Sequence, residues 1–214
     1  MGKEYEIQIL DINISKMRKI IKENKGKKIH KNIRFERAVF HRCNNKVKSF
    51  ARVRNEGKDT TMTVKIYNNP KFPDEYEVTI KENFETGKKF LEALNLKMKA
   101  YQETYREKWT LPIKGVHEIT FDTWPGIPTY MEIDCDNKKT LDKVIKLFNP
   151  SKDKITYGAS GAKYELYYGI PKNKFDNHIP LVTFKSIDKQ IKPKKNKDLF
   201  KKVVKEQKKK YVKK

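Results

Sequence analysis

The sequence predicts an α+β fold built around a largely antiparallel β-sheet. Eight or more segments have strand patterns and few have helical ones, a balance that favours antiparallel pairing. In addition, four short segments alternate charged and apolar residues. Successive strand side chains point to opposite faces, so each of these segments has one charged and one apolar face. They are Glu4-Tyr5-Glu6-Ile7-Gln8, Arg52-Val53-Arg54, Glu75-Tyr76-Glu77-Val78 and Glu132-Ile133-Asp134.

The first part of the chain predicts one helix among strands. Residues 13–25 place apolar residues at helical spacing from Ile14 onward, and Asn13 is the expected N-cap. The run Asn55-Glu56-Gly57-Lys58 predicts a hairpin turn between two strand patterns. Strands are expected over residues 3–10, 31–41, 47–55, 60–67 and 75–80.

The second part predicts two further amphipathic helices. Residues 84–95 carry Phe90, Leu91 and Leu94 on one face, and residues 139–149 show the same spacing. A Pro-Gly-Ile-Pro run turns the chain between two strands. Strands are expected over residues 98–111, 115–123, 129–135 and, as a last candidate, Tyr164 to Tyr168.

The charged strand faces allow two arrangements. In a half-buried sheet, the charged face meets water and the apolar face meets the core. Alternatively, the sheet closes into a barrel with its charged faces inward and helices over its apolar outer face. Buried charge is costly unless paired, hydrated or engaged by metal and ligand. Such a lumen would hold Glu4, Glu6, Glu75, Glu77, Asp122, Glu132 and Asp134 with Arg52, Arg54, Lys65 and Arg106.

The composition limits the kinds of partner that the chain is expected to bind. Its 214 residues are enough for one domain with a core, or a domain plus an extension. A formal net charge of +23 attracts polyanions such as nucleotides, polyphosphate, RNA or an anionic membrane. Only seven of the 50 basic residues are Arg, so each Arg marks a place where a planar, bidentate donor is needed.

Cysteine usage and hydropathy predict a soluble, cytoplasmic protein with no membrane partner. Cys43 and Cys135 give no disulfide framework, which favours a reducing intracellular setting. No apolar run is long enough to span a membrane, and the N-terminus does not resemble a signal peptide.

The C-terminal residues 186–214 differ in character from residues 1–185. They hold 13 Lys against three acidic residues. Leu199, Phe200, Val203 and Val204 predict a short helix inside an otherwise disordered, basic tail. A solvated tail and a tail that binds RNA or an acidic surface are both consistent with this pattern.

Several motifs together resemble the CYTH, or triphosphate tunnel metalloenzyme, superfamily. Glu4-Tyr-Glu6-Ile-Gln8 is similar to its N-terminal ExExK signature, and the other matches follow in the family's order over roughly residues 3–170. The stretch from Asp122 to Asp134 is the most specific. The other matches are Arg52-Val-Arg54, Thr63-Val-Lys65, Glu75-Tyr-Glu77, Tyr101-Gln-Glu-Thr-Tyr-Arg106 and Asp122-Thr-Trp-Pro-Gly-Ile-Pro-Thr-Tyr-Met-Glu132-Ile-Asp134.

The resemblance implies an eight-stranded, antiparallel, closed β-barrel whose charged lumen binds a triphosphate, with helices around it. It assigns three roles to residues of this chain. The implied metal ligands, for Mg²⁺ or Mn²⁺, are Glu4, Glu6, Glu132 and Asp134. The implied residues that assist the metals or position water are Glu77 and Asp122. The implied phosphate ligands are Gln8, Arg52, Arg54, Lys65, Arg106 and Lys163, the last of these expected on a late strand.

Two positions depart from the family pattern. The Lys of ExExK is Gln8 here, and a basic residue common two positions before Arg106 is Thr104. Gln8 can still donate a hydrogen bond to a phosphate, but it supplies no charge. Weaker binding of the terminal phosphate, an altered choice of substrate and a reduced or inactive enzyme are all consistent with these two changes.

The resemblance implies metal-dependent hydrolysis of inorganic triphosphate, a nucleoside triphosphate or thiamine triphosphate. Three alternatives remain open from the sequence. A class IV adenylyl cyclase would share the tunnel, an RNA 5′-triphosphatase would suit the basic tail, and a catalytically silent polyphosphate- or RNA-binding module would suit Gln8 and Thr104. His30, His41, His117 and His178 lack ligand spacing and are expected to be surface or structural residues.

Overall fold

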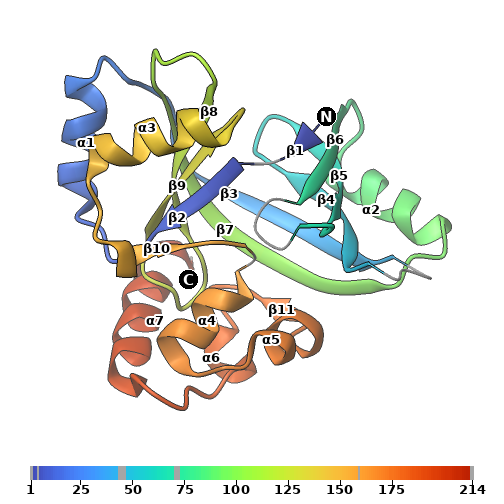
Figure 1. Cartoon of the computed structure of the whole chain (residues 1–214). Helices are drawn as coiled ribbons and strands as arrows, with labels where there is room; N and C mark the ends of the chain where they lie inside the picture. Colours follow the sequence, from blue (N-terminus) through green and yellow to red (C-terminus); the bar gives the residue numbers. More distant parts are fainter. Residues whose placement is uncertain (1, 4, 43–46, 70–72, 159, 213–214) are drawn as a thin grey trace.

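The computed structural model describes residues 2–3, 5–42, 47–69, 73–158 and 160–212 (Figure 1). Its strands belong to one sheet in the order β1-β6-β5-β4-β3-β7-β8-β9-β2-β10. Neighbours along this path are antiparallel, and β11 adds in parallel to β7. The strands are β1 (Gly2–Lys3), β2 (Tyr5–Ile9), β3 (Lys27–His41), β4 (Ser49–Asn55), β5 (Thr60–Ile66), β6 (Asp74–Ile80), β7 (Met98–Thr110), β8 (Val116–Thr123), β9 (Tyr130–Cys135), β10 (Ile155–Thr156) and β11 (Leu181–Val182). The predicted α+β class with an antiparallel sheet is confirmed.

The sheet curls into an open half-barrel, so the predicted closed eight-stranded barrel is wrong. The long strands β3 and β7 form its centre, and the β4–β6 side and the β8, β9, β2 side rise from them (Figure 1). β1 pairs with β6 and β2 with β9, but no ladder of the described residues joins β6 to β9 or β2. Alternating charge predicts which face turns inward, whereas closure depends on pairing between strands far apart in sequence.

Seven α-helices surround the sheet in the described part of the chain. Asn13, Asn83 and Asn137 cap the three helices expected from sequence, each accepting a hydrogen bond from a backbone N–H three residues on. The helices are α1 (Ile14–Glu23), α2 (Phe84–Ala93), α3 (Lys138–Phe148), α4 (Gly161–Tyr168), α5 (Lys172–His178), α6 (Ile187–Gln190) and α7 (Lys197–Tyr211), and a 3₁₀ turn spans Lys152–Lys154.

The helices bury the apolar outer face of the half-barrel. α1 and α3 contribute Ile21 and Val144 to a cluster with Ile7 and Ile133 of β2 and β9. Each of these side chains is fully buried, which stabilises the fold by about 1.5–3 kcal/mol per residue relative to exposure. α2 covers β4 and β5 on the other side of the half-barrel. The apolar residues of the alternating segments in β2, β4 and β9 therefore point outward to the helices, whereas Tyr76 and Val78 of β6 are exposed. The charged residues are left on the concave face.

The C-terminal region differs from the expectation. Tyr164 to Tyr168 belongs to α4 and is not a strand. α7 is longer than the short helix expected, and Phe200 and Val204 are buried with Trp124 and Tyr164 in one cluster. The expected disorder is therefore wrong for residues 186–212, because an apolar stripe along the Lys-rich helix is held against the rest of the chain.

Hydrogen bonds attach α7 to the turn between β8 and β9. The Gly126 N–H donates to Gln207 Oε1 over 2.6 Å, and Gln207 Nε2 donates to the carbonyls of Trp124 and Ile127 over 3.0 and 2.9 Å. Tyr164 and Tyr168 of α4 donate to further carbonyls of the same turn. The polar groups of a buried turn are thus satisfied by two C-terminal helices.

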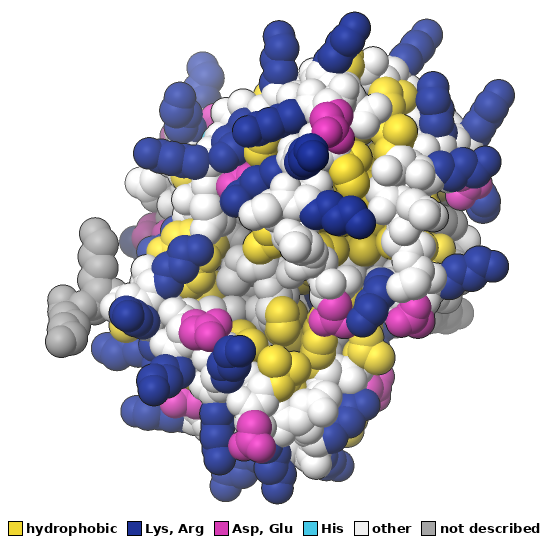
Figure 2. All heavy atoms as spheres, turned by 90° about the vertical axis from the view of Figure 1, so that its left-hand side faces the viewer, with side chains coloured by type: hydrophobic (Ala, Val, Ile, Leu, Met, Phe, Trp, Pro, Cys, Tyr) yellow, Lys and Arg dark blue, Asp and Glu magenta, His cyan; other side chains and the backbone are white. Residues whose placement is uncertain are grey.

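The surface is strongly basic without a single concentrated patch on the face that carries α1, α3 and α7. Lys and Arg side chains spread over this face, with acidic and apolar side chains between them (Figure 2). None of the described helices combines the length and apolar character needed to cross a membrane. Cys135 is a buried, free thiol, and Cys43 lies outside the described residues.

Candidate active site

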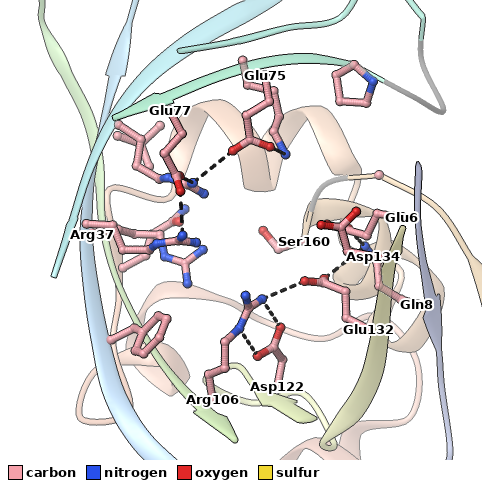
Figure 3. Close-up of a pocket in the computed structure, with 18 of the residues that line it drawn as sticks. Glu6, Gln8, Arg37, Glu75, Glu77, Arg106, Asp122, Glu132, Asp134 and Ser160 are labelled. Atoms are coloured by element: carbon pink, nitrogen blue, oxygen red, sulfur yellow. Dashed lines mark hydrogen bonds and ion pairs between the residues drawn. The ribbon is translucent and has the colours of Figure 1, made fainter. Parts of the chain in front are cut away.

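The concave face of the half-barrel forms a cavity of about 770 Å³. All but one of the residues predicted to form the site line this cavity (Figure 3), and the exception, Glu4, lies outside the described residues. The lining residues predicted from sequence are Glu6, Gln8, Arg52, Arg54, Lys65, Glu75, Glu77, Arg106, Asp122, Glu132, Asp134 and Lys163. Residues as far apart in the sequence as Glu6 and Lys163 therefore line one cavity.

One wall of the cavity is acidic and comes from β2, β8 and β9. In the β2–β9 ladder, Glu6 lies opposite Asp134 and Gln8 lies opposite Glu132. Asp122 of β8 is 2% exposed, so its charge depends on partners inside the protein. Burial raises the pKa of Asp134 to about 6, although His117 beside it acts in the opposite direction.

Arg106 of β7 links three of the acids. It donates to both carboxylate oxygens of Asp122 over 2.7 and 2.6 Å, to Glu132 over 2.7 Å and to Glu118 over 2.9 Å. Burial alone would lower the pKa of Arg106, but Asp122, Glu132 and Glu118 outweigh it and raise that pKa well above the ordinary value. Arg106 is thus a permanent cation at the base of the acidic wall.

The opposite wall comes from β4, β5 and β6 and carries cations that are paired with carboxylates of the same wall. Arg52 donates to Glu77 over 3.1 Å and to the Thr63 hydroxyl over 3.0 Å, while Lys65 lies 3.1 Å from Glu75. Arg54 pairs with Glu56, which the sequence placed in a hairpin turn and not in the site. Burial, and then Arg52, lower the pKa of Arg54. Strand alternation brings these groups to one face, as the sequence predicted.

Lys163 reaches the cavity from α4 and not from a strand. Its Nζ donates to Gln8 Oε1 over 3.0 Å and lies 4.5 Å from the centre of the Tyr130 ring. Burial lowers the pKa of Lys163, although Glu132 and Glu6 oppose this effect. Gln8, which has no charge of its own, is thus in contact with a buried ammonium that comes from a distant helix.

Several residues of the cavity were missed from sequence. The main one is Arg37 of β3, which shares the inward face with Phe35 and Val39 and donates to the Thr104 hydroxyl over 2.8 Å. Its residue type was the available signal, because Arg is rare in this Lys-rich chain. His117, which the sequence predicted to be a surface or structural residue, also lines the cavity. Its Nδ1 lies 3.1 Å from Asp134 Oδ2.

The donor set fits a hard divalent cation by its chemistry. Glu6, Glu132 and Asp134 offer carboxylate oxygens from two paired strands, the ligand type that Mg²⁺ and Mn²⁺ prefer. Within the described residues, no three His, Cys, Asp or Glu side chains are close enough to share one ion. Arg106 holds Glu132, and Gln8 Nε2 donates to Glu6 over 2.5 Å. A cation would therefore compete with these donors for the same oxygens.

Solved structures share this fold. The PH1819 protein of Pyrococcus horikoshii OT3 superimposes with a TM-score of 0.60 at 22% identity, over 76% of this chain and 98% of that one. An adenylate cyclase candidate from Vibrio parahaemolyticus gives a TM-score of 0.63 at 12% identity, over 77% and 98%. HpAC1 of Hippeastrum, an adenylyl cyclase candidate with a dominant triphosphatase activity, gives 0.51 at 12% identity, over 83% and 100%.

Sequence comparison identifies the family directly. No curated protein sequence matches the chain significantly. The family model described as CYTH domain matches residues 2–159. That span includes every strand of the half-barrel except β11 and all the predicted site residues except Lys163. The chain belongs to the CYTH domain family.

Proposed function

We propose that this protein hydrolyses a triphosphate substrate in the cavity with the help of a divalent cation. Inorganic triphosphate, a nucleoside triphosphate and thiamine triphosphate are the candidate substrates. The observation that carries the proposal is the pair of facing walls, one rich in carboxylates and the other in guanidinium and ammonium groups. A phosphate chain needs donors for its oxygens, and a cation beside it needs carboxylates.

The basic residues would bind the phosphate chain. Arg52 and Lys65 already meet carboxylate oxygens at 3.1 Å, through Glu77 and Glu75. These acids hold the cations in place when the cavity contains no substrate anion, and a phosphate oxygen would use the same donor geometry. Arg106 would contribute from the base of the cavity, and Lys163 would supply the positive charge that Gln8 lacks.

The acidic wall would hold the cation. Glu6, Glu132 and Asp134, together with Glu4, are the proposed ligands for Mg²⁺ or Mn²⁺. When bound, the cation neutralises phosphate charge and so favours attack by water on the terminal phosphorus. A cation that took Glu132 Oε1 from Arg106 would free a guanidinium donor for the substrate.

Glu77 and Asp122 would have different parts in the reaction. The side chain of Glu77 is 35% exposed, so its carboxylate can reach a water molecule in the cavity while it holds Arg52. We assign the orientation of the attacking water to Glu77. Asp122 is 2% exposed and is bound by two nitrogens of Arg106, so we assign it the positioning of that guanidinium.

The test is a product assay with the purified full chain. Inorganic triphosphate, ATP and thiamine triphosphate are each incubated with Mg²⁺ or Mn²⁺, and released orthophosphate, pyrophosphate and cyclic AMP are measured. Release of orthophosphate that requires the cation supports the proposal. Pyrophosphate with cyclic AMP would indicate a cyclase, and binding without turnover would indicate a silent module. Either result refutes hydrolysis.

Variants of two cavity residues, compared with a control variant outside the cavity, then test whether the reaction takes place at this site. Glu132→Gln is expected to abolish cation-dependent turnover, and Arg52→Ala to raise KM by about 10- to 100-fold through the loss of a charged donor. Glu92→Gln removes an exposed carboxylate of α2 that is remote from the cavity and serves as the control. Normal turnover in Glu132→Gln would contradict the assignment of the metal site.

A further inference from the structure

Arg37 is a buried guanidinium without an acidic partner in the described chain. The residue is 8% exposed and lines the cavity. The single hydrogen bond it donates among the described residues is that from Nη2 to Thr104, and its buried Nε has no partner. Arginine carries five N–H donors, so most of its capacity is unused. A charge in this position is normally paired, because burial removes its hydration.

The nearest charges make the position of Arg37 more unfavourable. Arg54 lies directly opposite Arg37 in the β3–β4 ladder. Burial, and then the charges of Arg54, Arg52 and Arg106, lower the pKa of Arg37 well below its ordinary value, and Asp122 offsets this only in part. Positive charge is therefore concentrated at this point of the cavity, and an anion placed there would relieve the repulsion.

The other arginines of the cavity differ from Arg37 in this respect. Arg52 is held by Glu77, Arg54 by Glu56 and Arg106 by Asp122. A phosphate group must compete with those carboxylates, because each guanidinium already donates to one. No carboxylate needs to be displaced from Arg37.

Two neighbours orient the Arg37 side chain for binding. Its guanidinium lies 4.8 Å from the centre of the Trp124 ring, a distance at which the ring face attracts a cation. The Thr104 hydroxyl fixes one nitrogen from the side. Figure 3 shows Arg37 on the wall across the cavity from Glu6, Gln8 and Asp134. The donors are thus ordered before any ligand arrives, which reduces the entropy that binding costs.

We propose that Arg37 is a phosphate ligand of this cavity and the donor kept ready for the substrate anion. This inference rests on the proposed function, since it concerns the same site and the same class of substrate. It predicts that removing the charge of Arg37 has opposite effects on the stability of the protein and on its affinity for a triphosphate. Removing the charge should stabilise the protein without ligand, because it removes an unpaired buried cation. The same change should weaken the binding of a triphosphate.

The experiment measures both effects without turnover. The full-length wild type, Arg37→Met and Arg34→Met are compared in EDTA by thermal unfolding and by calorimetric titration with inorganic triphosphate. Arg34 lies on the same strand, pairs with Glu103 over 2.6 Å and does not line the cavity, so it is the matched control. For Arg37→Met we expect a Tm a few degrees higher and a Kd about 10- to 100-fold weaker. For Arg34→Met we expect an unchanged Kd.

The outcomes separate this inference from the proposed function. An Arg37→Met variant that keeps the wild-type Kd overturns the inference, whether or not the wild type hydrolyses triphosphates. A lower Tm together with an unchanged Kd would indicate that Arg37 only supports the fold, and it overturns the inference too. If the wild type binds triphosphate through Arg37 but releases no product with Mg²⁺ or Mn²⁺, the inference stands and the proposed hydrolysis fails. Absence of triphosphate binding by the wild type overturns the inference.

Discussion

Replacing Arg106 should destabilise the protein strongly, and a divalent cation should reverse part of the loss. The Arg106 side chain is 12% exposed and donates four hydrogen bonds of 2.6–2.9 Å to Asp122, Glu132 and Glu118. Arg106→Met leaves these three carboxylates without their shared cation. Breaking one buried ion pair by removing a partner costs about 3–5 kcal/mol, and we expect a loss in free energy of unfolding within this range.

A cation bound to the acidic wall should take the place of the lost guanidinium charge. Binding to the native state alone at 100 times its Kd adds about 2.7 kcal/mol to the free energy of unfolding. Mg²⁺ or Mn²⁺ should therefore stabilise Arg106→Met more than it stabilises the wild type, in which Arg106 competes for the same oxygens. Urea unfolding in EDTA and with added cation, followed by tryptophan fluorescence, measures both quantities.

Arg18→Met is the matched control for this experiment. Arg18 of α1 donates two hydrogen bonds, of 2.9 and 2.7 Å, to the buried carboxylate of Glu107, which lies outside the cavity. Glu107 keeps Lys28 and Trp109 as partners, so we expect a smaller loss of about 1–2 kcal/mol and no specific response to cation. A loss below about 1 kcal/mol for Arg106→Met, or an equal effect of cation on both variants, would refute the reasoning.

Three further predictions concern the stability of the fold. Asp11→Asn should lower the free energy of unfolding at pH 7 by about 1 kcal/mol, because Asp11 is partly exposed where it accepts from Lys154 over 2.6 Å. Burial acts to raise the pKa of Asp11, but Lys154 and the Tyr167 hydroxyl outweigh it and lower that pKa overall. The difference should therefore disappear as the pH falls below about 3.8, as urea unfolding at several pH values can test. Gln207→Ala should cost about 2–4 kcal/mol, because it leaves the buried polar groups around Gly126 unsatisfied, and calorimetry should show a lower Tm. Gln8→Lys should reduce the free energy of unfolding by about 1–2 kcal/mol, because it places a second ammonium beside the buried Lys163, whose Nζ lies 3.0 Å from Gln8 Oε1. The double variant Gln8→Lys/Lys163→Gln should recover this loss, and equal stability of the single and double variants would contradict the contact.

The sequence alone determined most of the long strands and the charged face of the four alternating segments, although it also predicted a strand at Tyr164 to Tyr168, which is helical. Period-two alternation in segments such as Glu4 to Gln8 and Arg52 to Arg54 fixes which side chains share a face, whatever the rest of the fold does. The three amphipathic helices and their Asn caps were predictable for the same reason, since the signals are local. Together with the family resemblance, these patterns named the charged residues that form the two walls of the cavity, but they missed others that line it, such as Arg37, Glu56 and His117.

Only the tertiary structure decided how the sheet curves and which groups pair across it. The half-barrel, the contact of Lys163 with Gln8 and the position of Arg37 beside Thr104 depend on residues distant in sequence. The C-terminal helix was misjudged as part of a tail because its Lys content dominates its composition. Whether its apolar stripe is buried depends on the partner surface around Trp124, which folds from another part of the chain. Local patterns set the direction of each side chain, and long-range packing chooses its neighbours.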